Sequence, residues 1–319
     1  MKLAFVYAGQ GAQSVGMGKD FYDHYVNYRE TINRANRIME EEEGFSLREI
    51  SFEGPMERLS QTRYTQPCMT AFAIGITQLL AQDHIKPQMA LGLSLGEYGA
   101  LYAADVLDAD SILRLVSYRG KVMEEAAAGR EVKMVAILKA EDAQIEEAVK
   151  KAGAAMQGDL RVEIANYNCP GQTVISGDAQ AVDKACDLLK EAGVKRMVPL
   201  TVSGPFHTSL MAPAGEVLYQ KLAEFELCKP EIPVIANETA QPISIAQMKE
   251  SLKMQVQSSV RLSQSLQYLE TSGITHVIEI GPGATISKFI AKAAPSIKTH
   301  AISTVEDYLG VQAFLDQEA

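Results

Sequence analysis

Features of membrane proteins, nucleic-acid-binding proteins and disulfide-stabilised proteins are scarce in this sequence. No apolar run approaches the ~20 residues that span a bilayer, so we expect no membrane-spanning helix. Lysine and arginine number 30 against 40 acidic residues, and the net charge of -10 argues against nonspecific binding to nucleic acid or to an anionic membrane. A local basic patch remains compatible with this balance.

Cysteine is also rare. The four cysteines, Cys68, Cys169, Cys186 and Cys228, are scattered and form no CxxC pair. We therefore expect no metal site and a location in the reducing cytoplasm. The opening segment MKLAFVYAGQ has no cleavage-like site and runs into glycines, which predicts a first strand rather than a signal peptide.

The chain does have enough apolar residues for a sizeable core. Its 319 residues are 47% hydrophobic and 22% charged, which is typical of one large domain, or of one domain with an insert. Strand candidates lie at 3–8, 86–94, 232–237 and 276–283, and helical patterns lie at 20–41, 65–82 and 259–272. Strands that alternate with helices predict an α/β fold with a mostly parallel sheet.

The middle of the chain follows a different pattern. Over residues 128–198 the expected order is β-α-β-β-α-β, the ferredoxin-like plan, and the last strand candidate covers 195–202. We predict that residues 128–198 form a ferredoxin-like subdomain and that 1–127 and 199–319 form one larger domain. The alternative is a continuous α/β domain, which is disfavoured because the antiparallel middle pair needs its own sheet.

A serine lies in a glycine-flanked turn in the segment GLSLG. Ser94 follows a strand candidate and precedes small, helix-tolerant residues, and a nucleophile on such a turn leaves no room for Cβ atoms at Gly92 and Gly96. The next helix would point the backbone N–H of Leu95 at a developing oxyanion. The alternative is a glycine-lined packing turn without chemistry.

A serine nucleophile needs a base, and one histidine stands apart from the other four. His207 lies in GPFHTSLM, where Gly204 and Pro205 fix a turn and the following Thr208 suits a helix start. A structural histidine is the alternative. Because Ser94 calls for a base, we favour His207 in that role.

Arg119 is expected to be buried. It falls on the apolar stripe of a helix, seven residues after Ile112. A buried arginine keeps its charge and needs an anion. That anion is either an internal carboxylate or, if Arg119 faces Ser94, the free carboxylate of a bound acyl group.

Eight motifs together resemble one family of enzymes. They are GQGAQSVGMG, YTQPCMTAFA, GLSLGEYGAL, SYRGKVMEEA, NYNCPGQTVISG, GPFHTSLM, QSSVRLSQSL and EIGPGATIS, and they extend over nearly the whole chain. The chain resembles the malonyl-CoA:acyl carrier protein transacylases and is similar to the acyltransferase domains of polyketide synthases. The resemblance implies an α/β-hydrolase-like catalytic domain with an inserted ferredoxin-like subdomain.

The resemblance also implies roles for individual residues. Ser94 would be the acylated nucleophile, His207 its base, and Arg119 the ligand of the malonyl carboxylate. The backbone carbonyl of Gln255 would orient His207, which gives a Ser-His dyad without a carboxylate.

Further positions follow from the same motifs. Gln10 would supply the second oxyanion N–H beside that of Leu95, and Asn166 would line the substrate channel. The family usually has histidine before the nucleophile, whereas this chain has Leu93. We expect Leu93 to affect acyl preference, water access or rate.

The implied reaction is a ping-pong transfer of malonyl from malonyl-CoA to the phosphopantetheine thiol of acyl carrier protein, in fatty-acid synthesis, by a monomer without a cofactor. Alternatives are a trans-acting polyketide synthase acyltransferase, a thioesterase, a general esterase, or a non-catalytic partner protein. Acyl carrier proteins are acidic, so we predict a basic patch at the site entrance formed by Lys190, Lys195, Arg196 and Lys288.

Overall fold

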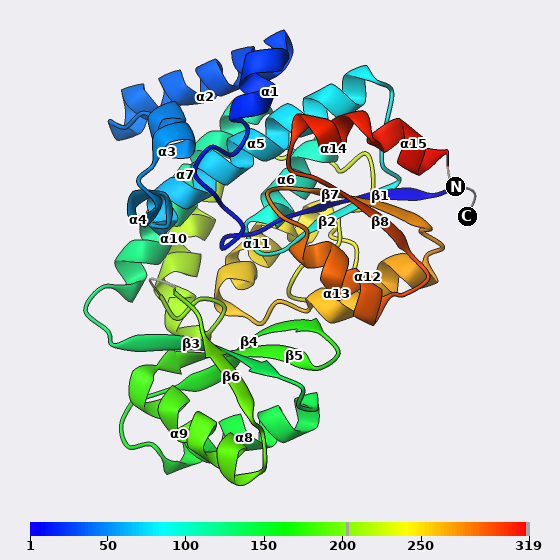
Figure 1. The fold of residues 1–319 in the computed structure, drawn as a ribbon. Coiled ribbons are helices and arrows are strands. Elements are labelled where there is room, and N and C mark those ends of the chain that lie inside the picture. The colour runs from blue at the N-terminus through cyan, green and yellow to red at the C-terminus, as the bar shows by residue number, and fades with distance from the viewer. Residues whose placement is uncertain (202–203, 317–319) are drawn as a thin grey trace.

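The computed structural model describes residues 1–201 and 204–316, which form a mixed α/β fold with two separate sheets (Figure 1). The strands are β1 (Leu3–Tyr7), β2 (Met89–Gly92), β3 (Val132–Leu138), β4 (Val162–Cys169), β5 (Gln172–Asp178), β6 (Arg196–Pro199), β7 (His276–Ile280) and β8 (Lys298–Ile302). The helices before the antiparallel sheet are α1 (Lys19–His24), α2 (Val26–Glu43), α3 (Leu47–Glu53), α4 (Met56–Leu59), α5 (Thr62–Gln82), α6 (Gly96–Ala103) and α7 (Ala109–Ala127). The later helices are α8 (Asp142–Ala155), α9 (Ala179–Glu191), α10 (Ala212–Lys221), α11 (Met248–Gln257), α12 (Leu262–Thr271), α13 (Thr285–Ala293), α14 (Val305–Leu309) and α15 (Val311–Leu315).

The first sheet is parallel and is buried on both faces. Its order is β2-β1-β7-β8. Along β1, Leu3, Phe5 and Tyr7 pack in one core with α5 and α6, whereas Ala4 and Val6 pack in another with α12 and α13. Apolar residues at every position of a strand are typical of a parallel sheet covered by helices on both sides. The carboxyl ends of these strands therefore meet at one edge, where β2 leads to Ser94.

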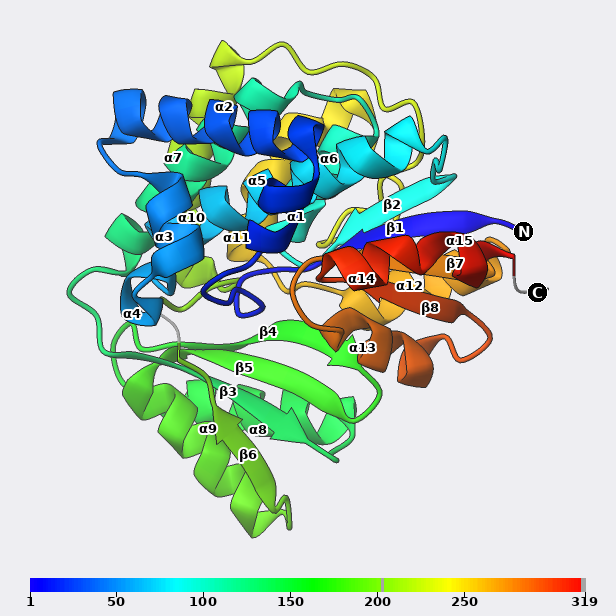
Figure 2. The same cartoon turned by 45° about the horizontal axis from the view of Figure 1, so that its top comes forward.

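The second sheet is antiparallel, in the order β4-β5-β3-β6. Helices α8 and α9 cover its outer face, and its inner face lies toward the rest of the molecule (Figure 2). Side chains alternate along β3, so Val135 and Ile137 pack beneath the two helices while Met134 and Ala136 line a cavity. The strand expected over 195–202 is formed at 196–199, and residue 202 lies outside the described residues.

The strand expected at 232–237 is not formed as a strand. This segment makes only isolated bridges, of Val234 with Ala90 and of Ile235 with Pro242. Pro233 has no N–H to donate, and the chain folds back on itself so that Ile243 donates to the carbonyl of Val234. The sequence patterns also missed α11 and β8, the latter an edge strand with largely half-buried residues.

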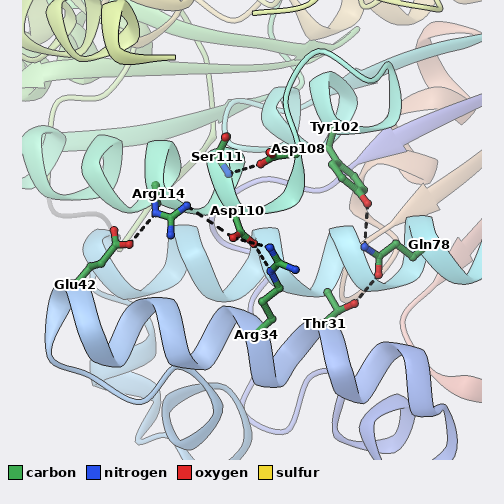
Figure 3. A network of polar contacts seen from close by, with 9 residues as sticks. All are labelled: Thr31, Arg34, Glu42, Gln78, Tyr102, Asp108, Asp110, Ser111 and Arg114. Atoms are coloured by element: carbon green, nitrogen blue, oxygen red, sulfur yellow. Dashed lines mark hydrogen bonds and ion pairs between the residues drawn. The ribbon is translucent and has the colours of Figure 1, made fainter. Parts of the chain in front are cut away.

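A polar network joins α2 to α7 (Figure 3). Arg34 donates to both carboxylate oxygens of Asp110, at 2.6 and 2.9 Å, and Arg114 pairs with Glu42 at 2.7 Å. Asp108 caps α7 by accepting from the N–H of Ser111 at 2.7 Å. The two arginines are exposed, at 64% and 40% of their side-chain surface, so solvent and salt screen these pairs more than a buried pair.

A buried carboxylate fixes the start of α13. Glu279, at the end of β7, is fully buried and accepts from the N–H groups of Ile286 and Ser287 at 2.9 and 2.7 Å, and from the Ser287 hydroxyl at 2.6 Å. An acid at a helix N-terminus satisfies N–H groups that the helix itself leaves unpaired.

We expect Glu279→Ala to lower the free energy of unfolding by about 2–4 kcal/mol, because it leaves buried donors without acceptors. Glu279→Gln retains one acceptor oxygen and should lose less. Urea denaturation measures both variants, with Arg34→Ala in the exposed network as the matched control. A larger loss in Arg34→Ala than in Glu279→Ala would contradict this assignment.

Candidate active site

Steric crowding forces the turn that presents Ser94. A Cβ on Gly92 would lie 1.9 Å from the carbonyl carbon of Gly96, and one on Gly96 would lie 2.1 Å from the carbonyl oxygen of Tyr7. Ser94 itself has a φ of 53°, in the left-handed region that side chains rarely adopt. The serine therefore stands on a tight, strained turn between β2 and α6.

His207 reaches this serine from a distant part of the chain. Its Nε2 lies 2.8 Å from the Ser94 Oγ, and its Nδ1 lies 2.8 Å from the backbone carbonyl oxygen of Gln255. A carbonyl oxygen only accepts, so Nδ1 carries the proton and Nε2 accepts from the serine hydroxyl. This tautomer is the one that a general base requires.

The surroundings of His207 favour its neutral form. Burial, followed by the positive charge of Arg119, lowers the pKa of His207 to about 4. The hydrogen bond to the Gln255 carbonyl acts in the opposite direction. At neutral pH the imidazole is therefore unprotonated and able to accept a proton.

Arg119 is buried, with 1% of its surface exposed, and it shares the serine with His207. Its Nη2 donates to the Ser94 Oγ at 3.3 Å and to the side-chain Oε1 of Gln255 at 3.0 Å, and its guanidinium lies over the ring of Tyr98. Within the described residues, the Nε of Arg119 has no hydrogen-bond partner. The guanidinium thus places a positive charge and the Nη2 donor beside the nucleophile, as an anionic ligand would need.

Two backbone N–H groups are available near Ser94. Leu95 precedes α6 and is buried, and Gln10 lines the cavity while its side chain donates to Thr62 Oγ1 at 3.0 Å. In residues 1–201 and 204–316, neither N–H group donates to another protein atom. Both therefore remain free to bind an oxyanion.

These groups open into a cavity of about 490 Å³ between the parallel sheet and the antiparallel sheet. Leu93 and Asn166, both expected at the site, line it. Sequence reasoning missed two buried amides in its wall, Gln66 and Asn168, whose side-chain oxygens have no partner in the described part of the chain. The cavity has both apolar and polar walls, as ligand-binding pockets commonly do.

None of the four residues expected in a basic patch lines this cavity. Lys288 lies next to Phe289, which does, whereas Lys190 at the end of α9 pairs with Asp187. Lys195 and Arg196 are exposed around the start of β6. Of the four, Lys288 is the one that adjoins a lining residue in sequence.

The described residues contain neither a metal-binding cluster nor a membrane-spanning helix. No group of three or more histidine, cysteine, aspartate or glutamate side chains is arranged to hold a metal ion in the part of the chain that the structure describes. In that same part, no helix combines the length and the apolar character needed to cross a membrane.

The chain matches known proteins over nearly its whole length. The family model described as "Acyl transferase domain" matches residues 4–308. A malonyl CoA-acyl carrier protein transacylase of Bacillus subtilis (strain 168) is 38% identical over 306 residues, 96% of this chain and 94% of that relative.

Solved structures agree with this match. A structure named as MCAT from Streptococcus pneumoniae has a TM-score of 0.91 and 41% identity, and covers 98% of this chain and 99% of that one. A malonyl-transacylase solved in complex with a type II PKS acyl-carrier protein has a TM-score of 0.91 and 31% identity. The match covers 97% of this chain and 98% of that one. The family resemblance predicted from the motifs is confirmed: the chain belongs to the acyl transferase domain family.

Proposed function

We propose that this protein transfers the malonyl group from malonyl-CoA to the phosphopantetheine thiol of acyl carrier protein. The observation that carries the proposal is the position of Arg119, whose buried guanidinium contacts the same serine oxygen as His207 and has a free Nε. A buried cation beside a nucleophile selects acyl groups that carry a carboxylate.

In the first half-reaction, His207 Nε2 accepts the proton of Ser94 as the serine oxygen attacks the malonyl thioester carbon. The N–H groups of Gln10 and Leu95 stabilise the oxyanion, and its collapse expels the coenzyme A thiolate, which takes the proton from His207. In the second half-reaction the carrier's thiol gives its proton to His207 and attacks the malonyl-Ser94 ester. Ser94 leaves with that proton, so the two halves balance.

The named relatives support the choice of substrates and partner. The Bacillus relative is named for malonyl CoA and acyl carrier protein, and one structural neighbour was solved with such a carrier. We extend these substrates to this chain and place its reaction in fatty-acid synthesis in the cytoplasm. The proposed chemistry uses only protein groups and needs no cofactor, and the site assembles within one chain, as a monomer would require.

The proposal includes an architecture. We assign residues 1–127 and 199–319 to an α/β-hydrolase-like catalytic domain and 128–198 to a ferredoxin-like subdomain. Support comes from the two separate sheets, and from a core cluster of buried residues confined to positions 135–194. The antiparallel sheet then acts as the outer wall of the substrate cavity.

Two cavity residues are assigned to substrate selection. Asn166 lines the cavity from β4. We assign it a contact with the acyl group or with the amides of pantetheine. Leu93 lines it beside Ser94 and packs against the apolar core of the parallel sheet. An apolar residue at this point excludes water from the acyl-enzyme, and we expect it to favour transfer over hydrolysis.

The test is a comparison of acyl donors. The purified protein is given malonyl-CoA, methylmalonyl-CoA or acetyl-CoA with holo acyl carrier protein, and acylated carrier and free acid are measured in parallel. We expect malonyl transfer to exceed acetyl transfer by at least tenfold in kcat/KM, and to exceed hydrolysis. Preference for acetyl-CoA would refute the substrate, and hydrolysis faster than transfer would identify a thioesterase instead.

A further inference from the structure

The backbone of the Ser94 turn is bound by a side chain far away in the sequence. Asn237 accepts a hydrogen bond from the Ser94 N–H through Oδ1 at 2.7 Å, and donates one from Nδ2 to the carbonyl oxygen of Gly92 at 2.7 Å. The side chain is buried, with 2% of the residue exposed. A single amide therefore bonds both sides of Leu93, within the strained turn.

Asparagine suits this position because it offers one donor and one acceptor at a fixed separation. The parallel bridge between Ala90 and Val234 sets Asn237 beside β2. The left-handed φ of Ser94 persists only where the surroundings impose it. The two hydrogen bonds of Asn237 help to hold Ser94 in this conformation.

A buried carboxyl group in turn fixes Asn237. Glu97, in the first turn of α6, is fully buried, and its Oε2 accepts the Asn237 N–H at 2.9 Å. Its Oε1 has no hydrogen-bond partner among the described residues. Burial raises the pKa of Glu97 to about 7, and Glu238 acts in the same direction. The hydrogen bonds from Asn237 and Gln255, and then the charge of Arg119, lower that pKa. Side chains from α6 and from the segment after Val234 are thus linked to one another and to the Ser94 turn.

We propose that Asn237 and Glu97 are positioning residues that set the conformation of the Ser94 turn and hold its Oγ between His207 and Arg119. The three hydrogen bonds of this Asn237–Glu97 pair form a chain from α6 through Asn237 to the nucleophile. Neither residue lines the cavity, so neither acts by touching substrate.

The consequence is a rate effect with little effect on binding. A misplacement of about 1 Å at a reacting atom costs about 10²-fold in rate. Loss of the Asn237 side chain should therefore lower the reactivity of Ser94 by about 10²-fold while KM for malonyl-CoA changes by less than about threefold. The expected KM for malonyl-CoA rests on the proposed function. The expected loss of Ser94 reactivity does not, since that reactivity can be measured without malonyl-CoA.

The test uses Asn237→Asp, which has the same shape. An ionised carboxylate would repel the Gly92 carbonyl, whereas a protonated one regains a donor. Burial penalises the charged form of a carboxyl, so a carboxyl buried at this position should accept a proton more readily than one in water. The charged groups around it are Glu97, Glu238, Arg261 and Arg119. We expect inactivation by phenylmethanesulfonyl fluoride to be about 10²-fold slower than in the natural protein at pH 8, and under tenfold slower near pH 5.5.

Two comparisons make the result specific. Asn36→Asp changes a buried asparagine of α2 whose Oδ1 only accepts, and should react like the natural protein at each pH. Glu97→Gln keeps a side-chain oxygen that can accept the Asn237 N–H, and should slow the inactivation at pH 8 far less than Asn237→Asp does. A purely structural defect in Asn237→Asp would not vary with pH.

The outcomes separate the two proposals. A rate ratio for Asn237→Asp that does not vary with pH would overturn the positioning role, as would an Asn237→Ala variant of native melting temperature that reacts within threefold of the natural protein. A natural protein that reacts with the sulfonyl fluoride but does not transfer malonyl would refute the proposed function and leave the positioning role standing.

Discussion

Arg119→Ala is expected to reduce malonyl transfer to the carrier by about 10²–10³-fold in kcat/KM, since removing one partner of a buried charge pair costs about 3–5 kcal/mol. Arg119 is buried beside Ser94, and its Nη2 lies 3.3 Å from the serine Oγ, where a donor can reach the carboxylate of a bound acyl group. The alanine variant leaves the malonyl carboxylate with no cation in a desolvated pocket.

The decisive measurement is the difference between two donors. Acetyl-CoA has no free carboxylate, so Arg119→Ala should lower acetyl transfer by less than about tenfold while malonyl transfer falls by about 10²-fold or more. Arg119→Lys retains the charge but not the two-pronged geometry, and should fall between the alanine variant and the natural protein. Equal losses for malonyl-CoA and acetyl-CoA would show that Arg119 maintains the structure of the site and does not bind the carboxylate of the acyl group.

The Arg119 result bears also on the alternative of an internal salt bridge. Its polar contacts are the Ser94 hydroxyl, the amide of Gln255 and the Tyr98 hydroxyl, and the buried Glu97 acts on it through charge. In the described part of the chain no carboxylate is close enough to form an ion pair with this guanidinium, so a bound ligand can supply that partner. A carboxylate-bearing acyl group fits this requirement.

The residues that the sequence predicted are those with a strong local signature. Gly92 and Gly96 mark the Ser94 turn because their Cβ atoms would clash within a few residues. Arg119 stands out because an arginine on an apolar stripe contradicts the local pattern. His207 was found by elimination among five histidines and by its turn. In each of these cases the signal lay within one segment.

The residues that the sequence did not reveal act only through tertiary contacts. Asn237 bonds a backbone group 143 positions away, in a segment whose expected strand was wrong. Glu97 looks like an ordinary acid in the first turn of a helix, and only the fold shows that it is fully buried. The basic patch expected at the site entrance stays a prediction, since a residue that does not line the cavity can still lie at its rim.

His207→Ala is expected to slow acylation of Ser94 by about 10²–10⁴-fold, the usual contribution of a general base. The base lies 2.8 Å from the serine oxygen in the tautomer needed to accept its proton. Stopped-flow measurement of malonyl-enzyme formation isolates this step from carrier binding. Added imidazole, which fits the vacated space, should restore part of the rate; a variant that acylates at the natural rate would remove His207 from the mechanism.

The low pKa of His207 also fixes the sign of two pH effects. Protonated imidazole cannot accept a proton, so acylation should be constant from about pH 5.5 to 8 as far as His207 is concerned, and should fall as pH drops through about 4. The pKa is about 6.5 in the unfolded chain, which therefore binds the proton more readily than the folded protein. Between pH 6.5 and 4 the natural protein should thus lose up to roughly 3 kcal/mol of unfolding free energy that His207→Gln does not lose. Parallel urea titrations at pH 7 and pH 4.5 measure the difference, and identical pH dependence in the two proteins would show that burial and Arg119 do not depress this histidine.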